Sequence, residues 1–227
     1  MSAVSKPPAP VRDSAPEIEF AVSAAEPLEY AATPTLKFAL DILARGGHPI
    51  RSLLLDVQIQ IAARRRGYGP DSQGRLLELF GTPDRWATTL RTLPWLRTTV
   101  VVPPFTGAST VAVTVPCTYD LEVTAARYLA ALEGGEVPLE LMFSGSVFYI
   151  APDGRLQTAR IPWESEVAYD MPVAVWRRTM DAHFPGSAWL RLGRESYDRL
   201  CAYKARHAFA SWEATIGALL ETGSEVR

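Results

Sequence analysis

The chain has 227 residues, of which 48% are hydrophobic and 21% are charged, as in an ordinary globular protein of one domain. The formal net charge of −2 and the pI of about 6.0 argue against a general electrostatic attraction to nucleic acid or to an acidic lipid surface. No apolar run reaches the ~20 residues that cross a bilayer, and no secretory signal is recognisable. With two cysteines and no CxxC pair, the composition predicts a cytoplasmic protein.

The N-terminal part of the chain predicts a tail followed by three strands. Residues 1–16 are rich in Ala, Ser and Pro, and we expect them to form a disordered tail. Apolar residues then recur at every second position in three runs, residues 18–22, 36–42 and 53–61, as in half-buried strands. Gly46, Gly47 and Pro49 separate the second and third runs, which favours pairing of these two runs as antiparallel neighbours.

The middle of the chain predicts short helices between further strands. Leu76, Leu77 and Phe80 indicate a helix that ends at Gly81, and Thr82 begins the next one as its cap. A longer helix has Leu121, Ala125, Leu129 and Leu132 on one face, with Thr118 or Asp120 as its cap. The patterns typical of strands are at residues 100–102, 111–115, 139–143, 147–150 and 156–161, with Asp153-Gly154 as a hairpin turn before the last.

Helical spacing dominates after Trp163. Val173, Trp176, Met180 and Phe184 share one helical face, Tyr197 to Lys204 suggest a second helix, and Ser211 caps a third whose Trp212, Ile216 and Leu220 should face inward. The whole order predicts an α+β fold, a mainly antiparallel β-sandwich with one inserted helix and with C-terminal helices. We expect a single domain over residues 17–222, whose helical part covers about residues 170–222.

The sequence contains no familiar catalytic, cofactor-binding or metal-binding motif. The three histidines are far apart, and no glycine-rich phosphate loop is present. Ser144-Gly145-Ser146 is not the GxSxG motif of hydrolases, and Gly145 is better interpreted as a bulge or a close approach between strands. Cys117 follows a strand and precedes a helix, where a thiol pKa can fall, although a small buried cysteine is the more frequent outcome there. We therefore assign no catalytic, cofactor-binding or metal-binding residues and expect no cofactor.

Three aromatic residues are the candidate interaction residues. Trp95, Phe105 and Trp163 each stand next to a proline at the end of a predicted strand. Aromatic side chains in such places either anchor a partner or close the ends of a sandwich core, and the second interpretation is the favoured one. Nearby, Glu164, Glu166 and Asp170 form either an ordinary polar connection or an anionic rim for binding.

Several short segments resemble an uncharacterised bacterial family that carries only a domain-of-unknown-function label. They are Pro94-Trp95, Val102-Pro103-Pro104-Phe105-Thr106-Gly107, Val115-Pro116-Cys117-Thr118-Tyr119-Asp120, Phe143-Ser144-Gly145, Ile161-Pro162-Trp163 and Pro172-Val173-Ala174-Val175-Trp176. The resemblance covers about residues 17–222. Genes of this family often lie near those of uptake nickel–iron hydrogenases, which implies an accessory role. The chain lacks the cysteine pairs and clusters of the hydrogenase catalytic and iron–sulfur subunits.

These observations favour a non-enzymatic accessory or protein-binding module over an enzyme. The resemblance implies a protein partner, a hydrogenase subunit or a maturation factor, and neither nucleic acid nor membrane insertion is expected. The alternative is an enzyme or small-ligand carrier of unfamiliar type, with a pocket between the sandwich and the helices. A third interpretation is a symmetric oligomer, and the sequence leaves the oligomeric state open.

Overall fold

The computed structural model describes residues 15–118, 120, 123–183, 185–187 and 191–224. The expected tail at residues 1–16 thus lies outside the described residues, apart from Ala15 and Pro16. The strands are β1 (Glu17–Pro27), β2 (Thr35–Arg45), β3 (Ile50–Ile61), β4 (Leu93–Val102), β5 (Ala108–Pro116), β6 (Glu136–Ile150), β7 (Leu156–Ile161) and β8 (Glu166–Pro172). The α-helices are α1 (Pro70–Arg75), α2 (Leu77–Phe80), α3 (Trp86–Thr89), α4 (Thr124–Ala131), α5 (Val173–Asp181), α6 (Arg194–Arg206) and α7 (Trp212–Ser224), with short 3₁₀ turns at Ala63–Arg65 and Pro83–Arg85.

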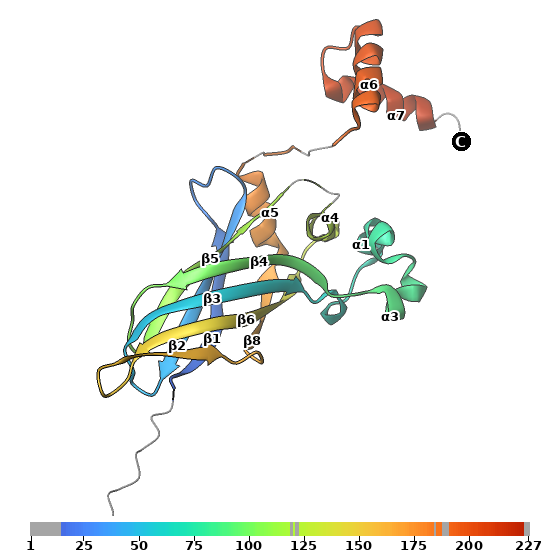
Figure 1. Ribbon diagram of the computed structural model, residues 1–227. Coiled ribbons are helices and arrows are strands. Elements are labelled where there is room, and N and C mark those ends of the chain that lie inside the picture. Colours follow the sequence, from blue (N-terminus) through green and yellow to red (C-terminus); the bar gives the residue numbers. More distant parts are fainter. Residues whose placement is uncertain (1–14, 119, 121–122, 184, 188–190, 225–227) are drawn as a thin grey trace, which may run out of the picture. The chain divides into compact units, whose positions relative to one another are not determined.

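Two antiparallel sheets form the β-rich part of the chain (Figure 1). One has the strand order β1-β2-β5, and the other has the order β4-β3-β6-β7, with β8 pairing with β6 beyond the end of β7. The predicted pairing of residues 36–42 with residues 53–61 is therefore wrong, because β2 and β3 belong to different sheets. Gly46 and Gly47 both have positive φ and turn the chain from one sheet to the other, since a tight glycine turn fixes a change of direction but not the strand's partner.

The core lies between the two sheets, as the alternating runs predict. Every second residue of β2 and β3 is fully buried and points inward, namely Leu36, Phe38, Leu40 and Ile42 on β2 and Leu53, Leu55, Val57, Ile59 and Ile61 on β3. Phe20 of β1 stacks on Phe143 of β6 with ring centroids 4.4 Å apart. Phe38 meets Trp95 of β4 and Tyr169 of β8 edge to face. The predicted α+β fold with a sandwich-like pair of antiparallel sheets is confirmed.

Helices α4 and α5 test the helices that the sequence predicts near residues 121–132 and 173–184. Helix α5 packs against β1, β2 and β8 and buries Val173, Trp176 and Met180, as its spacing predicts; Phe184 lies outside the described residues. Helix α4 begins at Thr124, later than expected, and no side chain caps its N-terminus at Val123. Thr118 instead accepts a hydrogen bond from the backbone of Asp120 in the preceding turn, at 3.0 Å, because a short hydroxyl bonds most easily to its own turn.

The described chain forms two compact units, one reaching residue 188 and the other beginning at residue 189. The second unit contains α6 and α7. Ser211 caps α7 as predicted, because its hydroxyl accepts a hydrogen bond from the backbone of Ala214 at 3.0 Å. The predicted inward face of α7 is wrong, however, because Trp212, Ile216 and Leu220 are exposed and Thr215 is the buried residue. No helix among the described residues is long and apolar enough to cross a bilayer.

Candidate functional site

The three predicted interaction aromatics lie in different places. Trp95 and Phe105 are half-buried and pack against the core, Trp95 near the end of β3 and Phe105 beside Ile50 at its beginning. Both residues are thus partly covered by the sandwich core. Trp163 lies in the turn between β7 and β8, which both pair with β6, and the residue is 84% exposed. The fold therefore brings none of the three together, and Trp163 alone presents its ring to solvent.

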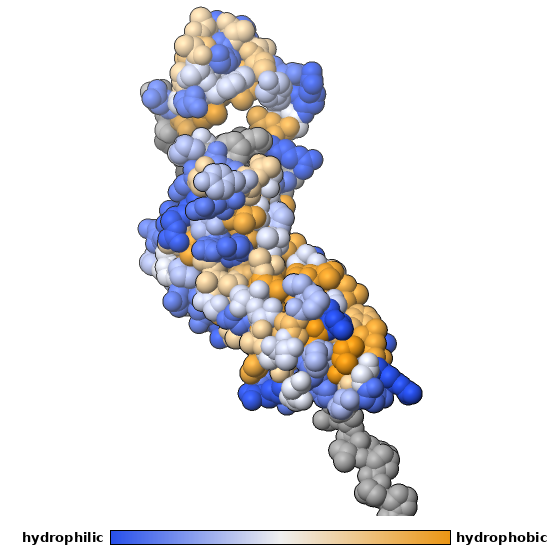
Figure 2. Space-filling view, turned by 90° about the vertical axis from the view of Figure 1, so that its left-hand side faces the viewer, coloured by the Kyte–Doolittle hydropathy of each residue, from blue (hydrophilic) through white to orange (hydrophobic). Residues whose placement is uncertain are grey.

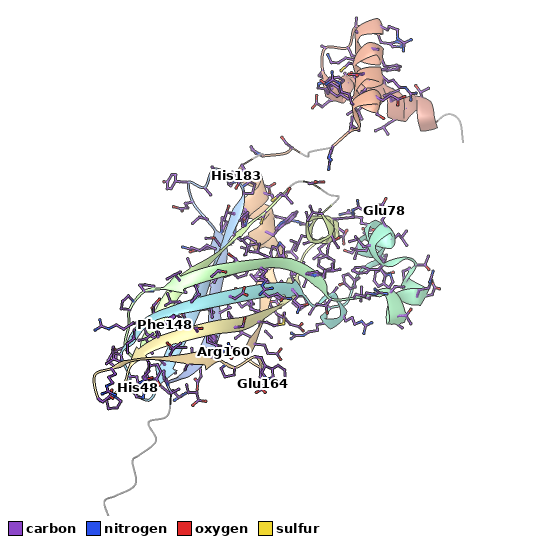
Figure 3. The ribbon with its side chains drawn as sticks, viewed as in Figure 1. His48, Glu78, Phe148, Arg160, Glu164 and His183 are labelled. Carbon is purple, nitrogen blue, oxygen red and sulfur yellow. The ribbon has the colours of Figure 1, made fainter. Side chains whose placement is uncertain are left out.

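His48 and His183 both make contacts within the sandwich unit. His48 is buried with its ring 5.3 Å from that of Tyr149, whereas His183 lies at the opposite end of the sandwich (Figure 3). The Nδ1 atom of His183 lies 3.2 Å from the carbonyl oxygen of Thr179, and its Nε2 atom lies 2.9 Å from that of Ala31, so the ring links α5 to the β1–β2 turn. Within the part of the chain that the structure describes, no group of three His, Cys, Asp or Glu side chains could hold a metal ion.

Cys117 does not have the environment of an activated nucleophile. Its thiol is partly covered, and its Sγ atom lies 3.6 Å from the carbonyl oxygen of Val115. Burial raises the pKa of this thiol to about 12, so the thiol is protonated at neutral pH. Because the thiolate is the reactive form, this geometry favours the interpretation of Cys117 as a small packed residue.

Gly145 marks a close approach of two strands, one of the two interpretations that its sequence context predicts. It pairs with Leu55 of β3 and has a φ of 142°. A Cβ atom built at this position would lie 2.0 Å from the carbonyl oxygen of Leu54, a distance that real contacts do not reach. Glycine at this position therefore lets β3 and β6 come together directly beside Leu54, which points to the outer side of the sheet.

The outer side of the five-stranded sheet carries exposed apolar residues at one end. Val101 of β4 is 67% exposed, Leu156 of β7 is 61% exposed and Leu54 of β3 is 46% exposed. Val101 and Leu54 are directly opposite each other in the register, and half-buried Phe148 of β6 lies opposite Ser52, two residues before Leu54 on β3. We call these four residues, Leu54, Val101, Phe148 and Leu156, the apolar face.

Hydrophobic residues also gather on part of the surface in the space-filling view. Figure 2 shows such a group low on the right of the molecule. A folded domain usually exposes such side chains singly, and a group of them on one face is typical of a surface that meets another molecule. The apolar face is therefore the candidate functional site.

An unpaired cation borders the apolar face. Arg160 of β7 is exposed and lies opposite Ser146, next to Phe148 on the neighbouring strand (Figure 3). Among the described residues no carboxylate pairs with it. Arg97 on the same side of the sheet is different, because Asp56 accepts a hydrogen bond from its Nε atom at 3.0 Å and the pKa of that carboxyl is lowered by this bond. The charge of Arg160 is thus available to a carboxylate of another molecule.

The sequence contained a signal for this face that alternation alone did not reveal. Leu54 is the apolar member of the polar series Ser52, Asp56, Gln58 and Gln60 on β3. Val101 and Phe148 lie in uninterrupted apolar runs, residues 100–102 and 147–150. In an antiparallel sheet with one covered side, such a run necessarily places an apolar residue on the open side. Only the register shows that these residues are neighbours.

Comparison with solved structures gives only remote similarities. The chain is similar to the "Putative ApaA Protein from Bordetella pertussis", with 11% identity over 69% of this chain and 95% of that chain, at a TM-score of 0.27. It is also similar to a β-glucosidase from Kluyveromyces marxianus, with 10% identity over 69% of this chain and 15% of that chain, at a TM-score of 0.25. β-Glucosidase 3B from Thermotoga neapolitana gives 11% identity, 68% and 17% coverage and a TM-score of 0.25. Similarities at these scores support no conclusion about function.

Comparison with known sequences identifies the family of the chain but no characterised relative. No curated protein matches the chain. A family model described as a family of unknown function, DUF6084, matches residues 15–227, which include the whole sandwich unit and both C-terminal helices. The predicted resemblance to a family of unknown function is thereby confirmed, and the chain belongs to the DUF6084 family.

Proposed function

We propose that the chain is a non-enzymatic accessory module that binds a protein partner through the apolar face. The observation that supports this most directly is the grouping of Leu54, Val101 and Leu156, all strongly exposed, around Phe148 on one end of a sheet. Burying each of these side chains against a partner contributes about 1 to 2 kcal/mol. The protonated thiol of Cys117 gives no support to the alternative of an enzyme with a cysteine nucleophile.

The partner surface that fits this face is apolar with an acidic residue at its border. Arg160 offers a guanidinium that can hold a carboxylate with two hydrogen bonds, which orients the partner as well as attracting it. Exposed Arg51, at the bulge where β3 begins, adds a second positive charge near the same end of the sheet. Trp163 follows β7 closely and has the chemistry of an interface anchor, so we include it in the proposed contact.

The biological setting is proposed from the family resemblance. Because genes of the family that the motifs resemble often lie near those of uptake nickel–iron hydrogenases, we propose a hydrogenase subunit or maturation factor in the cytoplasm as the partner. The role proposed for this chain is to bind that partner and not to carry the metal chemistry. The geometry of the apolar face supports protein binding in general, and the resemblance supports this particular class of partner.

The test compares affinity capture of three tagged full-length proteins from their native cells, with mass spectrometry of what is recovered. The wild-type chain is compared with Leu54→Glu/Val101→Glu on the apolar face. The matched control is Ala112→Glu/Thr114→Glu, which places the same charges on exposed positions of β5 in the other sheet. We expect a hydrogenase subunit or maturation protein with the wild type and with the control, and its loss with the apolar-face variant.

Two outcomes would contradict the proposal. Recovery of the wild-type chain alone at its native concentration, with unchanged hydrogenase activity after deletion of the gene, would overturn both the binding role and its setting. Equal capture of the same partner by the apolar-face variant would leave a binding role but would reject the apolar face as the contact. Circular dichroism of all three proteins shows whether the sheets are intact.

A further inference from the structure

The second compact unit has an open groove of its own. The groove lies between α6 and α7, has a volume of about 460 Å³, and is lined by Ser196, Arg199, Leu200, Ala202, Tyr203, Arg206 and Leu219. Six of these seven residues come from one stripe of α6, because they recur at three- and four-residue spacing. Leu200, Tyr203 and Leu219 make the floor apolar, and an arginine stands toward each end.

These two arginines differ from the other basic groups that the structure describes on α6. Arg194 is paired with Asp198, at 3.2 Å. Lys204 donates to the carbonyl oxygens of Phe209 and Ala210 and lies over the ring of Trp212. In the described part of this unit, no carboxylate pairs with Arg199 or Arg206. The groove is therefore positively charged at two points, although the whole chain has a net charge of −2.

The two helices bury very little between them. None of the α6 residues is buried, and Thr215 is the buried residue of α7. Leu219 in the groove and Ile216 one turn earlier are exposed. Two helices of 13 residues each are too few to enclose a core of their own, and a further helix laid against the open side is the usual way to complete such an arrangement.

We infer that the groove between α6 and α7 binds an acidic amphipathic helix of a partner protein. Residues seven apart on a helix are separated by about 10 Å along its axis, so Arg199 and Arg206 match two carboxylates seven residues apart on a helix that lies along α6. The apolar side chains between those carboxylates would then cover Leu200, Tyr203 and Leu219. The apolar floor favours a helix over a nucleic acid strand, whose binding relies on stacked aromatics along a basic track. The inference needs no contact at the apolar face.

The test uses the full-length protein and a fluorescein-labelled helical peptide of about 14 residues, with two glutamates seven apart and leucines between them. Fluorescence anisotropy should give a dissociation constant on the order of 10 μM. Arg199→Glu/Arg206→Glu should weaken binding by about tenfold or more, whereas Arg178→Glu, an exposed arginine on α5, should have no effect. A peptide with lysines in place of the glutamates should bind the double variant better than the wild type, which a misfolded variant could not do.

Three results would overturn the inference. The first is equal binding of the glutamate peptide to the wild type and to Arg199→Glu/Arg206→Glu. The second is binding of a labelled single-stranded oligonucleotide without binding of the peptide, which would assign the arginines to phosphates. The third is self-association that depends on these arginines, measured by sedimentation, which would identify the occupant as a second copy. The Leu54→Glu/Val101→Glu variant must bind the peptide normally, so failure of this inference is distinguishable from failure of the proposed function.

Discussion

The outer sides of the two sheets differ in the side chains that they present to water. On the three-stranded sheet, Arg45 binds Glu19 and Lys37 binds Glu26 across neighbouring strands, and Thr110 donates to Asp41 at 2.6 Å. Charges and hydroxyls on that side thus find partners within the sheet. On the five-stranded sheet, one end carries exposed Leu54, Val101 and Leu156 around half-buried Phe148, with Arg160 unpaired among the described residues.

This difference is the physical basis of the proposed binding role of the apolar face. Exposed ion pairs contribute little to stability but keep a surface hydrated and discourage association. An exposed apolar group contributes nothing to the stability of the isolated chain, and its burial against a partner is favourable. The polar side therefore has its charges satisfied within the fold, whereas the apolar face would gain free energy by being buried against the partner that we propose.

The first prediction separates the inside of the sandwich from its outer side. Phe38→Ala removes a fully buried ring and should lower the free energy of unfolding by about 4 kcal/mol. Phe148→Ala, on the apolar face, should cost under about 1.5 kcal/mol and should instead reduce capture of the partner. Urea unfolding of both variants measures the difference. Equal losses of stability would mean that Phe148 belongs to the core and that the apolar face is smaller than proposed.

The second prediction concerns the strand contact beneath Leu54. Gly145→Ala places a methyl group against the backbone of Leu54 and should lower the free energy of unfolding by about 3 kcal/mol. Gly154→Ala is the matched control, because Gly154 also has positive φ, of 80°, but nothing lies within 4 Å of its added Cβ atom. It should cost about 1 kcal/mol. Similar losses in urea unfolding would show that backbone strain, and not the close approach, explains Gly145.

The third prediction compares an arginine from each outer side. Arg160→Ala should leave thermal unfolding unchanged and should slow association with the partner about three- to tenfold at low salt. Arg45→Ala breaks the bond to Glu19, so it should lower the melting temperature slightly, by an amount that disappears in high salt, without affecting partner binding. Surface plasmon resonance and thermal scans at two ionic strengths measure both. A slower association for Arg45→Ala as well would point to the polar side as part of the contact.

The smallest predicted effect is a loss of stability in acid. The hydrogen bond from Arg45 holds the pKa of Glu19 below its usual value, and the hydrogen bond from Thr110 does the same for Asp41. Carboxyls with a lowered pKa in the folded state stabilise it above their ordinary pKa of about 4, and this contribution is lost as the pH falls through the lowered values. The melting temperature should therefore decrease below about pH 4, and less steeply for Glu19→Gln/Asp41→Asn. Identical slopes for the variant and the wild type would contradict this assignment.

Much of the fold was predictable because it depends on local periodicity. The alternation in residues 36–42 and 53–61 identified two inward-facing strands residue by residue, and the spacing of Val173, Trp176 and Met180 identified the buried side of α5. The pairing of these strands was not predictable from Gly46 and Gly47. The predicted burial of Trp212, Ile216 and Leu220 on α7 was also wrong. Helical spacing shows which residues share a side of a helix, but it does not show whether anything covers that side.

The amino-acid sequence by itself determined the inward side of the strands at residues 36–42 and 53–61 and the cap at Ser211, and it limited Gly145 to a bulge or a close approach. Each of these depends on the residue and its immediate neighbours. Only the tertiary structure decided that Leu54, Val101, Phe148 and Leu156 form one surface. These residues come from four strands, and their proximity depends on the register of β4, β3, β6 and β7. Register is set by non-local backbone pairing and by the burial of the opposite side of the sheet, and no local pattern in the sequence contains that information.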